Sequence, residues 1–134
     1  MTGKGYATSV LVCTPEGIPL VMDDWRQNQN LWKLPGGRSE AVDNGDPKAC
    51  GARELEEETG ICVMPDILKE ISRQDKGSYI KIYYEVHLQK LPKLRERGDE
   101  GELIKVFHPA EILKMDNFLP PHRNAVINVI ASLS

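Results

Sequence analysis

The sequence lacks the features that mark membrane and exported proteins. It has no apolar run long enough to cross a membrane. Its first six residues lack the apolar core of a signal peptide. We therefore expect no membrane partner and a location in the cytoplasm.

Cysteines are few and basic residues are not in excess. The three cysteines, Cys13, Cys50 and Cys62, form no CxxC pair, so neither a zinc knuckle nor a redox motif is expected. Buried free thiols are the prediction for all three. The formal net charge is −3, whereas a general nucleic-acid binder carries a basic excess. No stable nucleic-acid partner is expected.

What remains is the composition of an ordinary globular protein. The 134 residues are 40% hydrophobic and 28% charged, which suits one compact domain over residues 1–134. There is no internal repeat and no linker rich in glycine, serine or proline. Predicted strands and helices are interspersed along the chain, which favours an α/β class with helices on both sides of a sheet.

Segments rich in β-branched and apolar residues predict the strands. Residues 6–13 and 18–22 flank a Pro-Glu-Gly turn, which predicts a hairpin. Residues 31–34 predict a short strand that ends at Pro35-Gly36-Gly37. The other expected strands are an interrupted segment at 61–71, a long strand at 78–88 and a short one at 103–107.

Helix signals are clearest in the middle of the chain. Asp46-Pro47 predicts a helix start, with aspartate at the N-cap and proline at the first helical position. The helix should run to about Glu58, and Gly60 lies where a left-handed C-terminal cap is expected. Further helices are expected at 109–114 and 122–133.

The central helix carries three carboxylates on one side. At about 100° per residue, Glu54, Glu57 and Glu58 lie opposite Ala52 and Leu55. Like charges at these spacings cost a few tenths of a kcal/mol per pair, roughly, and the helix C-terminus already disfavours anions. Divalent cations would reverse that cost, and Mg²⁺ prefers carboxylate oxygens. The competing interpretation is a solvated acidic face.

These residues resemble the signature of the Nudix hydrolases. Residues 53–61 read Arg-Glu-Leu-Glu-Glu-Glu-Thr-Gly-Ile, and the second half of that signature is Arg-Glu-apolar-x-Glu-Glu-x-Gly-apolar. The preceding segment at 31–37 looks like the strand and turn that usually enter the signature. The resemblance covers most of the chain, but only the central block is specific.

The first half of the signature departs from the family pattern. The interval from Gly37 to Arg53 is two residues longer than the family spacing. Glu40, Asp43 and Asp46 each remain candidates for the acidic residue that replaces the first glutamate of the signature.

The resemblance implies a fold, an activity and a cofactor. The fold is a Nudix-like α/β/α sandwich with a mixed β-sheet. The activity is hydrolysis of a nucleoside diphosphate linked to another group, with Mg²⁺ or Mn²⁺. Nucleoside triphosphates, dinucleoside polyphosphates and nucleotide sugars all remain open as substrates, and a homodimer is compatible with the family.

The resemblance also implies roles for particular residues. Glu54, Glu57 and Glu58 would bind the metal, and Glu57 or Glu58 could instead activate the water. Gly36 or Gly37 would offer a backbone carbonyl to the metal, and Arg53 would orient the glutamates. Many family members take the base from a downstream loop, which points to Glu100 and Glu102; the competing interpretation is an exposed charged loop.

Substrate contacts are predicted around the double glycine. The cations Arg26, Lys33 and Arg38 could meet phosphates or be surface charges. Trp25, in a polar loop, could stack on a base, whereas Trp32 is expected to pack in the core. Two other functional classes compete with the enzyme: a Nudix-like sensor that binds a nucleotide without cleaving it, and an acidic protein-interaction module.

Overall fold

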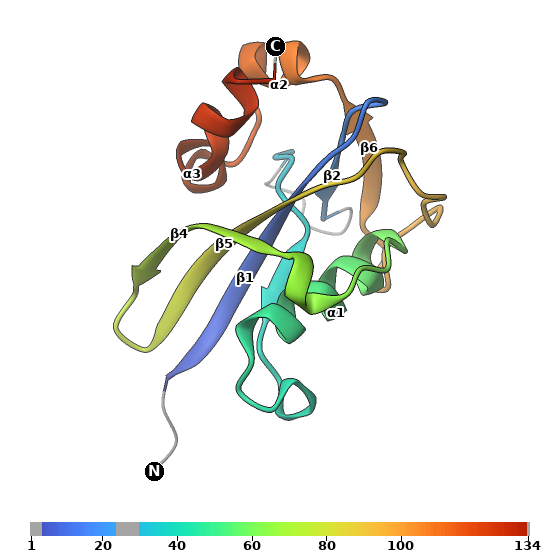
Figure 1. The fold of residues 1–134 in the computed structure, drawn as a ribbon. Coiled ribbons are helices and arrows are strands. Elements are labelled where there is room, and N and C mark those ends of the chain that lie inside the picture. Colours follow the sequence, from blue (N-terminus) through green and yellow to red (C-terminus); the bar gives the residue numbers. More distant parts are fainter. Residues whose placement is uncertain (1–3, 24–29, 134) are drawn as a thin grey trace.

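The computed structural model describes residues 4–23 and 30–133. Its centre is a four-stranded mixed sheet in the order β3-β1-β5-β4 (Figure 1). These strands are β1 (Gly5–Cys13), β3 (Gly36–Arg38), β4 (Lys69–Asp75) and β5 (Tyr79–His87). Strand β1 runs antiparallel to β3 and parallel to β5, and β4 runs antiparallel to β5. A second sheet pairs β2 (Ile18–Met22) with β6 (Leu103–Phe107).

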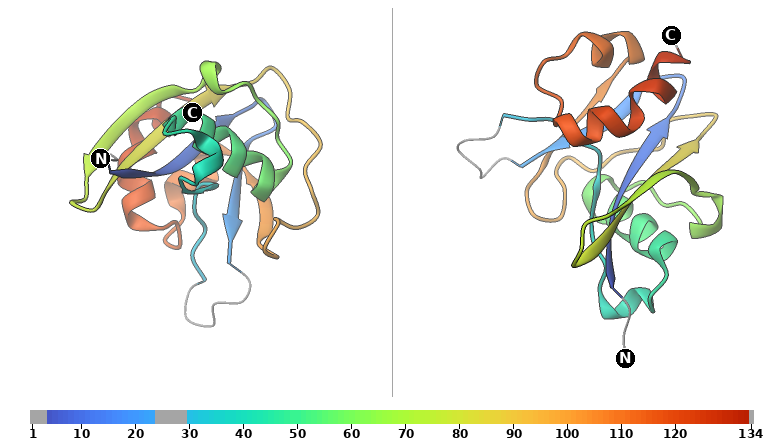
Figure 2. Two further views of the ribbon diagram at one scale, coloured as in Figure 1. Left: turned by 90° about the horizontal axis from the view of Figure 1, so that it is seen from below. Right: turned by 90° about the vertical axis from the view of Figure 1, so that its left-hand side faces the viewer.

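Helices cover both faces of the central sheet. Helix α1 (Pro47–Thr59) lies on one face, and α3 (Pro120–Ala131) lies on the other with α2 (Pro109–Lys114) beside it (Figure 2). Along β1, Val10 packs in the cluster that holds Leu55 of α1, and Leu11 packs in the cluster that holds Val126 of α3. Successive side chains point to opposite faces, and both faces are covered, so the strand reads as a continuous apolar run. The predicted α/β/α arrangement around a mixed sheet is confirmed.

The predicted hairpin of residues 6–22 is wrong in its pairing. β1 and β2 form as strands, but they are joined only by an isolated bridge between Thr14 and Gly17. β5 pairs along the whole of β1, and β3 takes residues 7–9 on its other edge. After the turn, β2 instead forms a full ladder with β6, in which all five residues of each strand are paired.

The strand predicted at 31–34 is also misplaced. Trp32 and Lys33 form only isolated bridges, and the strand is made by Gly36–Arg38. The double glycine is therefore part of the sheet and not its end. A Cβ on Gly36 would collide with the backbone carbonyl of Thr8 in β1, so only glycine permits this close pairing.

Elsewhere the sequence predictions have mixed outcomes. The segment 61–71 is largely not extended: Pro65–Ile67 is a 3₁₀ turn, and β4 begins only at Lys69. The strands at 79–87 and 103–107 and the helix at 109–114 are confirmed. The last helix begins two residues earlier than predicted, at Pro120.

Within residues 4–23 and 30–133, no helix combines the length and apolar character that a membrane crossing needs.

The prediction that all three cysteines are buried is wrong for one of them. Cys13 and Cys50 are buried free thiols, but Cys62 is exposed. Cys62 lies two residues after Gly60, beyond the helix end and outside both core clusters. Trp32, by contrast, packs against the core as predicted, with its ring edge-on to Phe107 at 5.1 Å between centroids.

Candidate active site

A cavity of about 360 Å³ opens between α1, β3 and the loop at 99–102. Helix α1 contributes Glu54, Glu57 and Glu58 to its lining, and the loop contributes Asp99, Glu100 and Glu102. Asp23, Lys33, Gly36, Gly37 and Arg38 complete it. We call this the acidic cavity. It gathers most of the residues that the sequence proposed for metal, base and phosphate.

Helix α1 begins and ends as the sequence predicted. The Asp46 side chain accepts a hydrogen bond from the Lys48 backbone N–H at 3.0 Å, and proline follows at the first helical position. Gly60 ends the helix with a φ of 85°, and its N–H donates to the Glu56 carbonyl. This left-handed conformation favours glycine because it has no Cβ.

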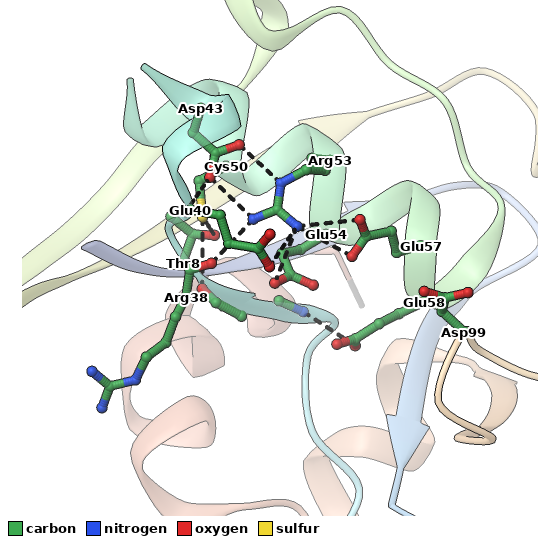
Figure 3. A network of polar contacts seen from close by, with 12 residues as sticks. Thr8, Arg38, Glu40, Asp43, Cys50, Arg53, Glu54, Glu57, Glu58 and Asp99 are labelled. Atoms are coloured by element: carbon green, nitrogen blue, oxygen red, sulfur yellow. Dashed lines mark hydrogen bonds and ion pairs between the residues drawn. The ribbon is translucent and has the colours of Figure 1, made fainter. Parts of the chain in front are cut away.

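The buried face of α1 sets the direction of its glutamates. Ala52 and Leu55 pack against the sheet in one core cluster. The helical period then turns Glu54, Glu57 and Glu58 toward the acidic cavity (Figure 3). The predicted division of the helix into an apolar face and a carboxylate face is confirmed.

The Arg53 guanidinium is bound on several sides (Figure 3). Its Nε and Nη2 donate to the two oxygens of Asp43 at 2.9 and 3.0 Å. Its Nη1 donates to both oxygens of Glu57 at 3.2 Å, and Nη2 also donates to the Arg38 carbonyl at 3.1 Å. The hydrogen bond between Arg53 and Asp43 is the main cause that raises the pKa of Arg53 and lowers the pKa of Asp43. Arg53 thus stays charged and restrains Glu57.

The structure distinguishes the three acidic residues that the sequence left open. Asp43 ends the 3₁₀ turn Ala41–Asp43, is buried, and is the one bound by two guanidinium nitrogens. Glu40 is exposed, and its Oε2 lies 3.5 Å from Arg53 Nη1. Asp46 is occupied in capping α1. Of the three, Asp43 therefore makes the closest contact with the Arg53 guanidinium.

Two of the helix carboxylates are poorly solvated. Burial raises the pKa of Glu58 to about 8, an effect that Lys33 opposes and Glu102 strengthens. The Gly36 backbone N–H donates to Glu58 Oε1 at 3.3 Å. Burial likewise raises the pKa of Glu54 to about 7. Ionisation of these two carboxyl groups is therefore costly, and a bound cation would favour it.

The donor set fits a hard divalent cation. Carboxylate and backbone carbonyl oxygens are the ligands that Mg²⁺ and Mn²⁺ accept, and Mg²⁺ usually keeps waters and substrate phosphates as its other ligands. Across the described part of the chain, no three His, Cys, Asp or Glu side chains converge tightly enough to hold a metal by themselves.

Glycine at position 37 keeps the cavity open beside α1. A Cβ there would collide with the Glu54 carboxylate. The Gly37 carbonyl receives a weak contact from the Cys50 thiol at 3.7 Å. Cys50 is therefore close to the site, but its role is packing between α1 and β3.

The loop at 95–102 is fastened to the end of α1. Arg95 N–H donates to the Thr59 carbonyl, and Asp99 N–H donates to the Glu57 carbonyl at 3.0 Å. Carbonyls in the last turn of a helix lack intrahelical partners, so the loop satisfies them. This docking brings Glu100 and Glu102 to the acidic cavity.

Glu102 and Glu100 differ in how firmly they are held. Glu102 is 5% exposed, and its Oε1 accepts the Glu100 backbone N–H at 3.0 Å. The interpretation of this region as an exposed charged loop is therefore wrong for Glu102. The Glu100 side chain lies at the exposed rim.

The predicted substrate contacts are partly placed. Lys33 lines the acidic cavity, with its Nζ 3.1 Å from Asp23 Oδ2. Arg38 also lines it, and its guanidinium lies 4.3 Å from the centre of the Tyr79 ring. Trp25 and Arg26 fall outside the described residues, so those two predictions stay predictions.

Two lining residues were missed from the sequence. Asp23 follows the last residue of β2 directly, where a loop acid has no motif to mark it. Asp99 precedes Glu100 in the charged loop. Glu100 was proposed because many family members take a base from this loop. The only sequence signal for Asp99 was that it lies next to Glu100.

Comparisons with known proteins agree with this geometry. Residues 3–129 match the family model described as NUDIX domain. The chain is 26% identical to Phosphatase NudJ of Escherichia coli (strain K12) over 121 residues, covering 88% of this chain and 78% of the relative.

Solved structures share the fold. The NUDIX domain of Shewanella oneidensis NrtR, complexed with ADP ribose, superposes with a TM-score of 0.77 at 14% identity, covering 100% of this chain and 91% of that one. A bifunctional NMN adenylyltransferase/ADP ribose pyrophosphatase from Francisella tularensis, complexed with AMP and a Mn ion, gives 0.68 at 20% identity, covering 99% of this chain and 42% of that one.

Proposed function

This chain belongs to the Nudix family and is a Nudix hydrolase, and we propose that it cleaves the pyrophosphate of a nucleoside diphosphate linked to another group, with Mg²⁺ or Mn²⁺. The observation that carries the proposal is the convergence of Glu54, Glu57 and Glu58 on one cavity beside the double-glycine strand. Nucleotide ligands in structures of the same fold, ADP ribose and AMP, support the substrate class.

In this proposal the helix carboxylates hold the metal. Glu54, Glu57 and Glu58 are the side-chain ligands, with the backbone carbonyl of Gly36 or Gly37 as a further donor. The metal would neutralise phosphate charge and activate water when bound. The raised pKa values of Glu54 and Glu58 support this role, because a cation would relieve the charge that burial penalises. The Mn ion bound by the Francisella protein is consistent with it.

We assign the proton acceptor to the loop rather than to the helix. Glu57 is paired with Arg53 through both carboxylate oxygens, and Glu57 and Glu58 are both proposed ligands of the metal, which would engage their oxygens. Glu102 is held at the cavity by the Glu100 N–H and is not engaged by a cation among the described residues. It is therefore the carboxylate available to take a proton from the attacking water as the bond to the leaving phosphate breaks. Lys33 would bind oxygens of this pyrophosphate. The Arg38 guanidinium points away from the helix glutamates (Figure 3) and lies over the Tyr79 ring, so it would meet a more distant part of the substrate.

The test is release of phosphate or pyrophosphate from a nucleotide panel with Mg²⁺. Glu57→Gln and Glu58→Gln should each lower turnover by about a hundredfold or more. Glu56→Gln is the matched control, since Glu56 is exposed on the same helix and does not line the cavity. If both site variants fold and keep wild-type rates, the mechanism is wrong.

A second set of measurements separates metal binding from proton transfer. Glu102→Gln retains an acceptor for the Glu100 N–H, so it should keep Mg²⁺-dependent thermal stabilisation while kcat falls. Loss of stabilisation in Glu102→Gln would place Glu102 among the metal ligands instead. Nucleotide binding without any turnover in the wild type would favour a sensor.

A further inference from the structure

A second cavity, of about 280 Å³, lies on the α3 face of the central sheet. Three cations line it, Arg38, Lys76 and Lys81, and no carboxylate does so among the described residues. We call it the Lys81 cavity. Its charge is opposite to that of the acidic cavity, which points to an anionic occupant.

The register of the sheet builds this cavity. Arg38 of β3, Ala7 of β1 and Lys81 of β5 are direct partners in one row across the three strands. Partners in register point to the same face, and adjacent strands lie about 4.8 Å apart. Arg38 and Lys81 therefore stand two strand spacings apart on either side of a methyl group. The small Ala7 side chain is the floor between two cations.

Lys81 is held in place without a counter-charge beside it. Its Nζ donates to the neutral Ser9 Oγ at 2.7 Å and lies 5.0 Å from the centre of the Tyr83 ring. Within residues 4–23 and 30–133 it makes no ion pair, although an ammonium has three donors. Burial lowers the pKa of Lys81 to about 8, and Lys33 lowers it further, whereas Glu58 opposes the shift. A bound anion would therefore stabilise the charged form of Lys81.

The aromatic side chains of this cavity are less available than its cations. The Arg38 guanidinium covers the Tyr79 ring at 4.3 Å from its centre. Tyr83 is 2% exposed and packs edge-on against His122. Stacking of a base on Tyr83 would require repacking of the core, and stacking on the face of Tyr79 that Arg38 covers would require displacement of Arg38. The start of α3, at Leu119 and Pro121, closes the cavity and adds the positive end of a helix dipole.

The two cavities share one residue. Arg38 lines both the acidic cavity and the Lys81 cavity. A substrate that binds at the helix glutamates and passes Arg38 would reach the α3 face. An anionic group at that end would meet Arg38 and Lys81 together.

We infer that the Lys81 cavity binds a phosphate group of the substrate that is not part of the scissile pyrophosphate. The inference rests on the proposed function and sharpens its substrate class, to nucleotides that carry an additional, remote phosphate. Phosphate is the group that fits, because it can accept from the Arg38 fork and from the Lys81 ammonium at once. Lys81 then determines specificity and takes no part in bond cleavage.

The experiment compares substrates that differ only in a remote phosphate. NADPH against NADH, and coenzyme A against dephospho-coenzyme A, are two such pairs. In at least one pair, wild-type kcat/KM should favour the phosphorylated member by about tenfold or more. Lys81→Met should remove that preference while changing kcat/KM for the other member by less than about threefold. Lys90→Met, which removes an exposed lysine that lines neither cavity, should retain the preference.

Two results would overturn the inference: no preference within any hydrolysed pair, or an equal loss for both members in Lys81→Met. A binding measurement separates its failure from failure of the proposed function. Inorganic phosphate, titrated without metal, should shift the backbone amide NMR signals of Ala7 and Tyr79 in the wild type but not in Lys81→Met. If no nucleotide is hydrolysed yet these shifts occur, the proposed function fails and the anion site stands. If the shifts are absent or unchanged by the substitution, the anion site is wrong.

Discussion

Arg53 and Asp43 form a two-bond pair, with Nε 2.9 Å from Oδ1 and Nη2 3.0 Å from Oδ2. The pair joins the middle of α1 to the 3₁₀ turn that follows β3. Because Arg53 also binds Glu57 and the Arg38 carbonyl, it links α1 to β3, the strand whose Arg38 lines both cavities. Loss of Asp43 should therefore affect both stability and activity.

Asp43→Asn should lower the free energy of unfolding by about 2 kcal/mol, since it leaves the Arg53 charge without its buried partner. Urea denaturation at neutral pH measures the change. Turnover should fall as well, because Asp43 no longer holds Arg53 in place and Arg53 then restrains Glu57 less firmly. Asp66→Asn removes an exposed aspartate and should leave both quantities unchanged. A fully stable and active Asp43→Asn would show that the pair is dispensable.

Metal should stabilise the wild type more than a variant that lacks one helix carboxylate. At a hundredfold excess of Mg²⁺ over its dissociation constant, the expected gain is about 2.7 kcal/mol. Glu58→Gln should lose most of this gain, and chelation by EDTA should remove it from the wild type. Thermal unfolding with and without Mg²⁺ measures both effects. Equal stabilisation of the two proteins would exclude Glu58 as a ligand.

Gly37→Ala should impair the site without unfolding the protein. Its Cβ would collide with the Glu54 carboxylate, so that ligand must move, and kcat/KM should fall by about tenfold or more. Glu54→Asp shortens the side chain and so makes room for the new Cβ. Adding Gly37→Ala to Glu54→Asp should therefore lower kcat/KM by a smaller factor than adding Gly37→Ala to the wild type. Strictly additive losses would contradict the steric explanation. Gly5→Ala, whose Cβ would meet only Ser39 Oγ at 3.3 Å, is the control.

His122 should make the protein less stable as the pH falls. Burial lowers its pKa to about 3 from the ordinary 6.5, helped by Lys81 and Lys33, and its Nδ1 accepts the Leu34 N–H at 3.1 Å. Below pH 6.5 the unfolded chain binds a proton that the folded protein excludes. The stabilisation is therefore complete above that pH and is lost as the pH falls, by up to about 1.4 kcal/mol per pH unit.

His122→Asn keeps an acceptor for Leu34 but cannot titrate. Its free energy of unfolding should depend less on pH than that of the wild type between about pH 7 and about pH 5. His108→Asn alters an exposed histidine and should follow the wild type. Parallel curves for the wild type and His122→Asn would show that His122 does not cause the acid sensitivity.

The sequence predicted α1 well because the rules that define a helix are local. Asp46 and Gly60 mark its ends within one turn, and the spacing of Glu54, Glu57 and Glu58 sets their shared face. The pairing of the strands was harder to predict, because an apolar run does not indicate which strand it pairs with. Residues 18–22 were recognised as a strand, but their partner, β6, lies more than 80 residues further along the chain.

The acidic helix was thus determined by the sequence alone, through periodicity and capping, and the Nudix family through a specific motif. The tertiary structure decided everything that needs two distant segments to meet. It chose Asp43 as the partner of Arg53, held Glu102 at the cavity through a loop docked on the end of α1, and aligned Arg38 and Lys81 across Ala7. Such meetings depend on strand register and packing, which no local pattern encodes.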